Sequence, residues 1–243
     1  GEAPAAGSGV PRNRPLGVAP GRRRPKGGRD ERGERMRTIL VANRKGGVGK
    51  TVTAVTIATA LASRGAEVAL ADADAQKSAL RWLRQRPDTV RPVTGLDWSH
   101  KGDVGDAPKG IDWLVIDAPG ALKGDRAEAL IAEADAVVSP LMPSFFDLDS
   151  TRRFLKEIEG VKRVRKGKVP VHLLANRVRP QSKGVARLEA FFAELGQSPV
   201  AWISERSAYA DLAERGLGIF DQPQRSYVPL RAQWEPLLET LAP

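Results

Sequence analysis

The sequence predicts an α/β fold, in which a single doubly wound, mostly parallel sheet is flanked by helices. Short, continuous apolar runs alternate with segments that carry apolar residues at helical spacing. Such runs are typical of parallel strands that are covered on both faces. The chain has 243 residues and is 41% hydrophobic, which suffices for the core of one such domain. A glycine-rich segment separates the first apolar run from the first helical pattern.

The expected elements follow in order along the chain. Residues 38–42 form the first buried-strand run. An Ala-rich helix is expected at 50–64, with Gly65 as the residue that ends it. Further strands are predicted at residues 67–71, 111–116, 136–142, 169–175 and 200–203. Helices between them are predicted at residues 125–134, 150–164, 185–195 and 205–215.

Residues 1–35 differ from the rest in composition, because Gly, Pro and Arg recur and large aliphatic residues are few. Such a segment cannot bury enough apolar area to offset its chain entropy, so we expect it to be disordered. It holds nine basic and four acidic residues, and its net +5 is half of the +10 of the chain. Either it is a basic arm that touches nucleic acid through counterion release, or it is a solvated tail or non-native extension. Because Met36 directly precedes the first strand, the domain is expected at 36–243.

Two features that the sequence lacks, cysteine and long apolar runs, exclude several classes of protein. The chain has no cysteine, which excludes disulfide scaffolds, Cys-ligated zinc or iron–sulfur sites and Cys nucleophiles. This agrees with a cytoplasmic protein. The apolar runs are only a few residues long, and the N-terminus lacks the apolar core of a signal peptide.

Residues 45–51 read Lys-Gly-Gly-Val-Gly-Lys-Thr and lie between the first strand and the first helix. Glycine lets the backbone N–H groups of such a loop approach a phosphate, and the following helix N-terminus adds a positive dipole end. Lys50 would reach the β- and γ-phosphates and the Thr51 hydroxyl would ligate Mg²⁺. The strict pattern G-x-x-x-x-G-K-S/T fails at Arg44, so this is a variant with an additional lysine, Lys45.

Acidic residues end two of the predicted strands. Asp117 follows the third strand, where a ligand of metal-bound water belongs beside a phosphate loop. Asp72 and Asp74 follow the second strand. A carboxylate there could orient an attacking water or hold metal-bound water.

Together these segments resemble the ParA/MinD family of P-loop ATPases. Residues 43–51 resemble the deviant Walker A loop of that family, residues 72–76 its switch I and residues 116–119 its Walker B and switch II. Residues 143–147 and 175–177 fall where the family has a post-strand loop and an adenine-contacting Asn. The resemblance extends from Met36 to roughly the C-terminus.

The resemblance implies ATP and Mg²⁺ as cofactors and assigns the roles of the site residues. Lys45 would reach the partner's ATP across a homodimer and, with Lys50 and Asp74, would be catalytic; Asp74 would position the hydrolytic water. Thr51 and Asp117 would hold Mg²⁺, directly or through water. The implied nucleotide-binding residues are Lys45, Gly46, Gly47, Val48, Gly49, Lys50, Thr51, Val52, Asn176 and Arg177. Two residues depart from the family pattern: Val52 replaces a second Thr and Ala75 replaces the Pro of switch I.

The resemblance favours a small ParA-like ATPase for plasmid or chromosome partition or cargo positioning, cytoplasmic and nucleoid-associated. Such proteins dimerise on ATP, bind double-stranded DNA non-specifically and are switched off when a ParB-like or other small adaptor stimulates hydrolysis. Residues 227–241 carry one basic residue and two prolines, so we expect a packed helix and no membrane anchor. The alternatives are a metabolic P-loop enzyme of the dethiobiotin synthetase kind and a MinD-like membrane-positioning ATPase.

Basic residues that could contact DNA fall into two groups. A helix and its exit loop at 152–168 are rich in Lys and Arg, which indicates either a phosphate-contacting patch or a solvated helix face. A second, more scattered group lies in the C-terminal part. The candidates are Arg152, Arg153, Lys156, Arg163, Arg165, Lys183, Arg187 and Arg206.

Overall fold

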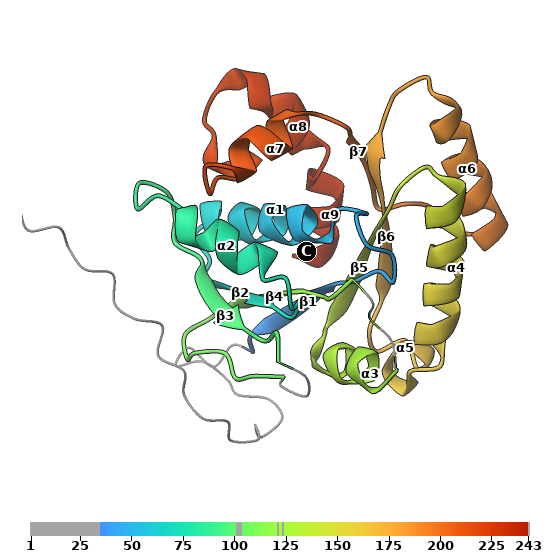
Figure 1. Ribbon diagram of the computed structural model, residues 1–243, viewed down its shortest axis with the longest axis horizontal. Helices are drawn as coiled ribbons and strands as arrows, with labels where there is room; N and C mark the ends of the chain where they lie inside the picture. The colour runs from blue at the N-terminus through green and yellow to red at the C-terminus, as the bar shows by residue number, and fades with distance from the viewer. Residues whose placement is uncertain (1–34, 101–103, 121, 123, 243) are drawn as a thin grey trace, which may run out of the picture.

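The computed structural model describes residues 35–100, 104–120, 122 and 124–242, so the predicted disordered arm lies outside the described residues except for Arg35. The described chain contains a seven-stranded sheet with the order β3-β2-β4-β1-β5-β6-β7, and neighbouring strands pair in parallel (Figure 1). The predicted fold class is therefore confirmed.

The strands are β1 (Arg37–Val41), β2 (Val68–Asp72), β3 (Thr94–Asp97), β4 (Trp113–Asp117), β5 (Ala136–Leu141), β6 (Val171–Val178) and β7 (Ala201–Ser204). Six of them match the predicted strands. The seventh, β3, was not predicted, because its sequence Thr-Gly-Leu-Asp contains no apolar run. It is one of the two edge strands, and both of its end residues are exposed.

The helices are α1 (Lys50–Ser63), α2 (Ser78–Gln85), α3 (Gly124–Glu133), α4 (Phe145–Glu159), α5 (Lys162–Arg165), α6 (Lys183–Leu195), α7 (Ala208–Ala213), α8 (Val228–Ala232) and α9 (Glu235–Leu241), with the 3-10 turns η1 (Ile219–Asp221) and η2 (Arg225–Tyr227). The helix predicted at 150–164 begins earlier, because the Ser144 hydroxyl caps α4 by accepting a hydrogen bond from the Asp147 N–H. It also ends at Glu159, before Gly160 and α5. The helix predicted at 205–215 is the shorter α7.

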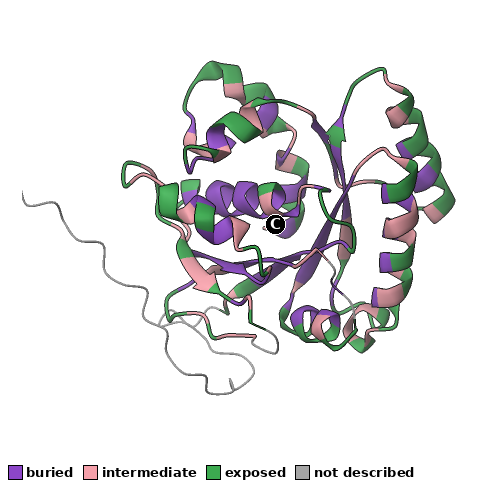
Figure 2. Ribbon diagram, viewed as in Figure 1, coloured by how far each residue is buried: buried purple, intermediate pink, exposed green. Residues whose placement is uncertain are grey.

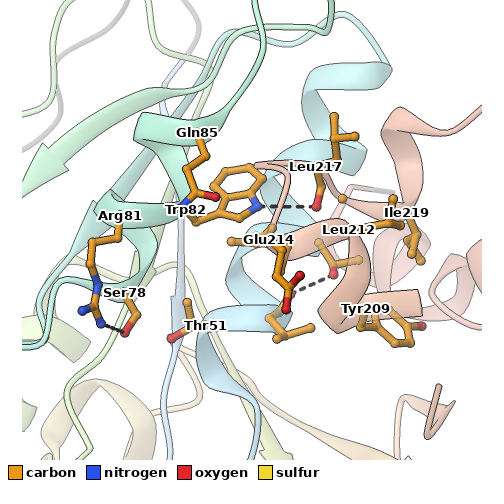
Figure 3. A pocket seen from close by; sticks show the side chains of 15 residues that line it. Thr51, Ser78, Arg81, Trp82, Gln85, Tyr209, Leu212, Glu214, Leu217 and Ile219 are labelled. Carbon is orange, nitrogen blue, oxygen red and sulfur yellow. Dashed lines mark hydrogen bonds between the residues drawn. The ribbon is translucent and has the colours of Figure 1, made fainter. Parts of the chain in front are cut away.

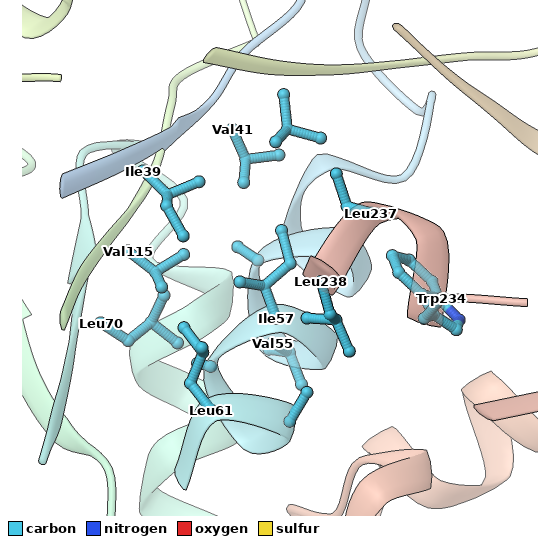
Figure 4. Packing of buried hydrophobic residues seen from close by; sticks show 14 of the residues in the cluster. Ile39, Val41, Val55, Ile57, Leu61, Leu70, Val115, Trp234, Leu237 and Leu238 are labelled. Atoms are coloured by element: carbon cyan, nitrogen blue, oxygen red, sulfur yellow. The ribbon is translucent and has the colours of Figure 1, made fainter. Parts of the chain in front are cut away.

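Helices cover both faces of the sheet (Figures 1 and 2). Helix α1 lies between the sheet and the C-terminal helices, and eleven of its residues are buried. The opposite face is covered by α3, α4 and α6. Figure 4 shows the core between the sheet, α1 and the C-terminal helices, where the labelled residues are Ile39, Val41, Leu70, Val115, Val55, Ile57, Leu61, Trp234, Leu237 and Leu238.

The C-terminal segment packs on α1 and α2. Leu237, Leu238 and Leu241 of α9 are buried, which confirms the predicted packed helix. Arg86, at the end of α2, forms a two-pronged ion pair with Asp221, in which both N–O distances are 2.8 Å and both side chains are at most 5% exposed. No helix in the described part of the chain is long and apolar enough to span a bilayer.

The strand order places β1 at the centre of the sheet, with β4 on one side and β5 on the other. Because all the strands are parallel, the loops that follow them meet along one edge. In open α/β sheets, ligands bind at this carboxyl edge, where the connections diverge to the two sides. The loop between β1 and α1 leaves the sheet at this point.

Candidate functional site

Asn43 anchors the start of the loop between β1 and α1. Its side chain is fully buried, and its amide Nδ2 donates to the Pro140 carbonyl at 3.0 Å and to the Thr151 hydroxyl at 3.1 Å. Its Oδ1 accepts a hydrogen bond from the Lys45 N–H at 3.0 Å. One side chain thus ties the loop to β5, to α4 and to itself, which fixes where the loop begins.

The end of the loop depends on glycine. Gly49 has φ +93°, and a Cβ at this position would lie 2.3 Å from Nδ2 of Asn176. The same Nδ2 donates to the Val48 carbonyl at 2.8 Å, so Asn176 of β6 holds the last turn of the loop. Sequence reasoning missed this anchoring role of Asn176. Its predicted contact with adenine stays a prediction.

The two lysines of the loop lie in different environments. Lys50 is 7% exposed, and its Nζ donates to the Lys45 carbonyl at 2.9 Å. Burial lowers the pKa of Lys50, while the charges of Asp117 and Asp74 act in the opposite direction. An ammonium has three donors, so the same group can also serve phosphate oxygens. The side chain of Lys45 is exposed to solvent.

Thr51 and Asp117 meet at the base of the loop. The Thr51 hydroxyl donates to Oδ2 of Asp117 at 2.7 Å. Burial raises the pKa of Asp117 to about 7. The hydrogen bond from Thr51 acts in the opposite direction, whereas the negative charge of Asp72 raises this pKa further. Asp117 Oδ1 is buried and makes no hydrogen bond to the described residues.

This pair fits a hydrated Mg²⁺. The ion takes one or two protein oxygens and completes its octahedron with water and substrate phosphate. A free carboxylate oxygen beside a threonine hydroxyl offers such ligands. Within the described residues, no group of three or more His, Cys, Asp or Glu could hold a metal ion by itself.

The segment after β2 carries the other predicted carboxylate. Asp74 accepts hydrogen bonds from the Gln76 N–H at 2.9 Å and, through Oδ2, from the Gly120 N–H at 3.1 Å. It therefore joins this segment to the one that follows β4. Asp72 is fully buried and accepts from the Asp74 N–H at 3.1 Å. The charges of Asp74 and Asp117 both act on the Lys50 ammonium, so these three side chains lie near one another beside the loop.

A cavity of about 600 Å³ opens beside the loop. It brings together Gly47, Gly49, Val52, Asn176 and Arg177, all predicted to bind nucleotide. Its other walls, which the sequence did not indicate, are Ile203, Ser204, Glu205, Arg206, Ser207, Tyr209, Ala210, Ala213 and Trp234. Arg177 has φ +52° and pairs with Glu205 at 2.6 Å, while Trp234 Nε1 donates to the Tyr209 hydroxyl at 2.9 Å.

A second cavity of about 330 Å³ adjoins the first and shares Val52, Tyr209 and Ala213 with it. Figure 3 shows Thr51 at one end and Trp82, Leu212 and Ile219 on its walls. It lies between α1, α2 and α7, and its lining is mainly apolar.

The predicted DNA-binding residues do not form one surface group. Arg152 donates to Glu194 at 3.0 Å, Arg153 pairs with Asp149 at 2.9 Å and Arg163 donates to the Ala132 carbonyl. Lys156 and Arg165 are exposed. Because α5 precedes β6, Arg163 and Arg165 lie at the amino edge of the sheet.

The other three candidates lie at the opposite edge. Lys183 and Arg187 follow β6, and Arg206 follows β7, so all three lie towards the carboxyl edge that carries the phosphate-type loop. All three side chains are exposed. The Arg206 guanidinium donates to the Glu205 carbonyl at 3.0 Å and also lines the larger cavity.

The model of the CobQ/CobB/MinD/ParA nucleotide binding domain family matches residues 39–219, which include the loop, the acidic strand ends and every residue that lines the two cavities except Trp234. The chain belongs to this family. Membership makes it a nucleotide-binding protein and, through the MinD and ParA members, an ATPase. ATP and Mg²⁺ are the ligands that the site fits, and the predicted family is confirmed.

Individual relatives agree with this assignment. The chain is 30% identical over 191 residues to the maintenance of carboxysome distribution protein A of Halothiobacillus neapolitanus, which covers 75% of this chain and 86% of that protein. It is 30% identical over 159 residues to the chromosome-partitioning ATPase Soj of Thermus thermophilus, which covers 53% of this chain and 64% of Soj. The solved ATP complex of McdA from Cyanothece has the same fold, with a TM-score of 0.63 and 20% identity over 83% of this chain and 96% of that one.

Proposed function

We propose that the chain is a ParA-like positioning ATPase that dimerises on ATP, binds double-stranded DNA without sequence preference and is switched off by partner-stimulated hydrolysis. The proposed cargo is a plasmid, a chromosome locus or a protein assembly. The names of the relatives, carboxysome distribution and chromosome partitioning, support this class of function. The observation that carries the proposal is the contrast between buried Lys50 and exposed Lys45 on one loop.

The described residues divide the chemistry of phosphoryl transfer among themselves. Lys50 and the loop N–H groups neutralise and position the phosphates, while Thr51 and Asp117 hold Mg²⁺, which when bound would offset the charge that develops in the reaction. Asp74 orients the attacking water. Lys45 is exposed and would reach a partner's nucleotide, so that hydrolysis depends on the dimer.

DNA binding is assigned to the carboxyl edge. A patch that ATP controls must lie where dimerisation can bring two copies together, and Lys183, Arg187 and Arg206 lie towards the edge that carries the nucleotide site. We therefore place DNA binding on these residues ahead of Arg163 and Arg165. The buried leucines of α9 support a function without a membrane anchor in residues 227–241. The proposed location is the cytoplasm, on the nucleoid.

The test compares nucleotide states. Sedimentation should show a dimer with ATP and Mg²⁺ and a monomer with ADP. Binding to duplexes of unrelated sequence should appear only in ATP and should weaken steeply with salt. Equal DNA affinity in the two nucleotide states would contradict the switch. Turnover of a small-molecule acceptor independent of DNA, or ATP-dependent pelleting with liposomes, would instead favour one of the two alternative functions.

A further inference from the structure

Arg126, in the first turn of α3, directs its half-buried guanidinium at three backbone carbonyls. One terminal nitrogen donates to the His100 carbonyl at 2.8 Å. The other donates to the Trp98 carbonyl at 2.5 Å and to the Ala73 carbonyl at 3.4 Å. The side chain thus joins α3 to the segments that follow β2 and β3, and Ala73 is the residue directly before Asp74.

The base of this contact is fixed on two sides. At the start of α3, the Gly124 N–H donates to the Glu157 carboxylate of α4 at 3.1 Å. Trp98 is 3% exposed, and its N–H donates to the Asp72 carbonyl at 2.8 Å. The donors of a guanidinium lie in one plane and keep fixed directions. A guanidinium that is held at Trp98 therefore offers its remaining N–H to Ala73 in a set direction.

The Ala73 carbonyl belongs to the peptide group that leads into Asp74. The N–H of this peptide group donates to Oδ1 of Asp72 at 3.1 Å, so Asp72 holds one end of the group and Arg126 the other. A peptide group is planar, and its orientation sets the backbone dihedral of the residue that follows. The two contacts together therefore determine the direction in which the Asp74 side chain leaves the backbone.

We infer that Arg126 is a positioning residue for ATP hydrolysis, which holds the peptide group before Asp74 so that the carboxylate faces the attacking water. The inference rests on the proposed function, since it uses the role of Asp74. A displacement of about 1 Å at a reacting centre can cost about 100-fold in rate, so a tie at the adjoining peptide group affects catalysis. The three carbonyls lie outside residues 43–51, so ATP affinity does not depend on Arg126.

The first test separates rate from affinity. Arg126→Ala should lower the single-turnover rate constant of ATP hydrolysis about 10-fold, while the dissociation constant of ATP in titration calorimetry stays unchanged. Arg231→Ala is the matched control, because Arg231 of α8 is also half-buried and donates to a backbone carbonyl, that of Gln222. It should hydrolyse ATP at the wild-type rate. A wild-type rate in Arg126→Ala would overturn the inference.

A double-mutant cycle distinguishes positioning from a general loss of structure. If Arg126 acts through Asp74, Arg126→Ala should change the residual rate of Asp74→Ala by less than about 2-fold. The same fold loss in both backgrounds would contradict the inference, because the arginine would then not act through this carboxylate. If Arg126→Ala does not fold, Arg126→Lys serves in the same cycle, since it keeps the charge but lacks the planar fork.

Hydrogen exchange gives a readout that needs no nucleotide. The backbone amides of residues 73–77 should exchange about 10-fold faster in Arg126→Ala than in the wild-type chain, and at the wild-type rate in Arg231→Ala. Unchanged exchange in Arg126→Ala would show that Arg126 does not hold this segment, which overturns the inference.

The outcomes separate the inference from the proposed function. If Asp74→Ala loses hydrolysis while Arg126→Ala hydrolyses ATP normally, the inference fails and the proposed role of Asp74 stands. If Asp74→Ala itself hydrolyses ATP normally, both fail.

Discussion

The loops that follow β1 and β2 both contribute to the nucleotide site, but they are held in different ways. Residues 43–49 are tied to the rest of the domain by two buried amides: that of Asn43 bonds to β5 and α4, and that of Asn176, in β6, bonds to the Val48 carbonyl. Residues 73–77 are tied by the carboxylates of Asp72 and Asp74, by the bond of the Ala73 N–H to the Asp117 carbonyl, and by the exposed ion pair of Lys77 with Asp97. The first loop thus depends on buried side chains, whereas most contacts of the second lie at strand ends near the surface, and we expect the second to rearrange more readily.

This difference suits the two tasks. A binding loop gains affinity when its geometry is fixed in advance, because no ordering cost remains. A switch must have a second arrangement within reach, and a segment whose contacts lie mostly near the surface has the lower opening free energy. The following predictions test whether the first loop serves binding and the second serves hydrolysis.

The largest effect is expected at Lys50. Lys50→Ala removes the buried ammonium of the first loop and should weaken ATP binding by about 100-fold or more, measured by titration calorimetry. Lys45→Ala is the matched control, five positions earlier on the same loop, and should retain ATP affinity while losing stimulated hydrolysis. If the two variants lost the same amount of ATP affinity, the assignment of binding to Lys50 and of stimulated hydrolysis to Lys45 would be wrong.

A large effect on rate alone is expected in the second loop. Asp74→Ala should lower steady-state ATP hydrolysis about 100-fold and leave ATP binding intact, which traps the ATP dimer. Glu133→Ala changes an exposed carboxylate at the end of α3, at the opposite edge of the sheet, and should hydrolyse ATP normally. Normal hydrolysis by Asp74→Ala would show that another group orients the water.

The nucleotide-free chain should lose stability as pH rises. Because burial raises the pKa of Asp117 from 3.8 to about 7, the folded chain holds a proton that the unfolded chain releases in this range. The contribution to the free energy of unfolding is therefore fully present below about pH 4 and is lost as pH rises through about 7, by about 1–4 kcal/mol. Asp72, whose pKa burial also raises, adds to the same trend.

Urea unfolding between pH 4 and 8 measures this loss, and Asp117→Asn should flatten the profile. Addition of Mg²⁺ and ATP should restore stability most at high pH, since the metal binds the ionised carboxylate. A flat profile in the wild-type chain would mean that Asp117 is already ionised in the free protein.

The smallest effect is expected at Asn176. Asn176→Ala removes the hydrogen bond to the Val48 carbonyl and should weaken ATP binding about 10-fold. Inorganic triphosphate separates the two roles of this side chain. An equal loss for triphosphate and ATP indicates that Asn176 acts by holding the loop, and a larger loss for ATP indicates an additional contact with adenine.

The sequence predicts the site better than it predicts the parts that hold it. Periodicity and the loop motif locate β1, α1 and Lys50, because these signals are local. The strand β3 was not predicted, since an edge strand that is partly exposed to water needs no apolar run. The helix α2 was not predicted either, because its eight residues are too few for a clear helical pattern. The anchoring by Asn43 and the ion pair of Arg86 with Asp221 join residues distant in sequence, and no local pattern encodes such partners.

The central position of β1 has a consequence for how the chain acquires its fold. It is the first strand of the described chain, yet its neighbours are β4 and β5, which come much later, after β2 and β3. Contacts between distant segments form slowly, because a long loop must close before they add stability. On the ribosome, β1 therefore remains without hydrogen-bonded neighbours until β4 emerges, and during that interval its apolar residues are open to chaperones and to aggregation.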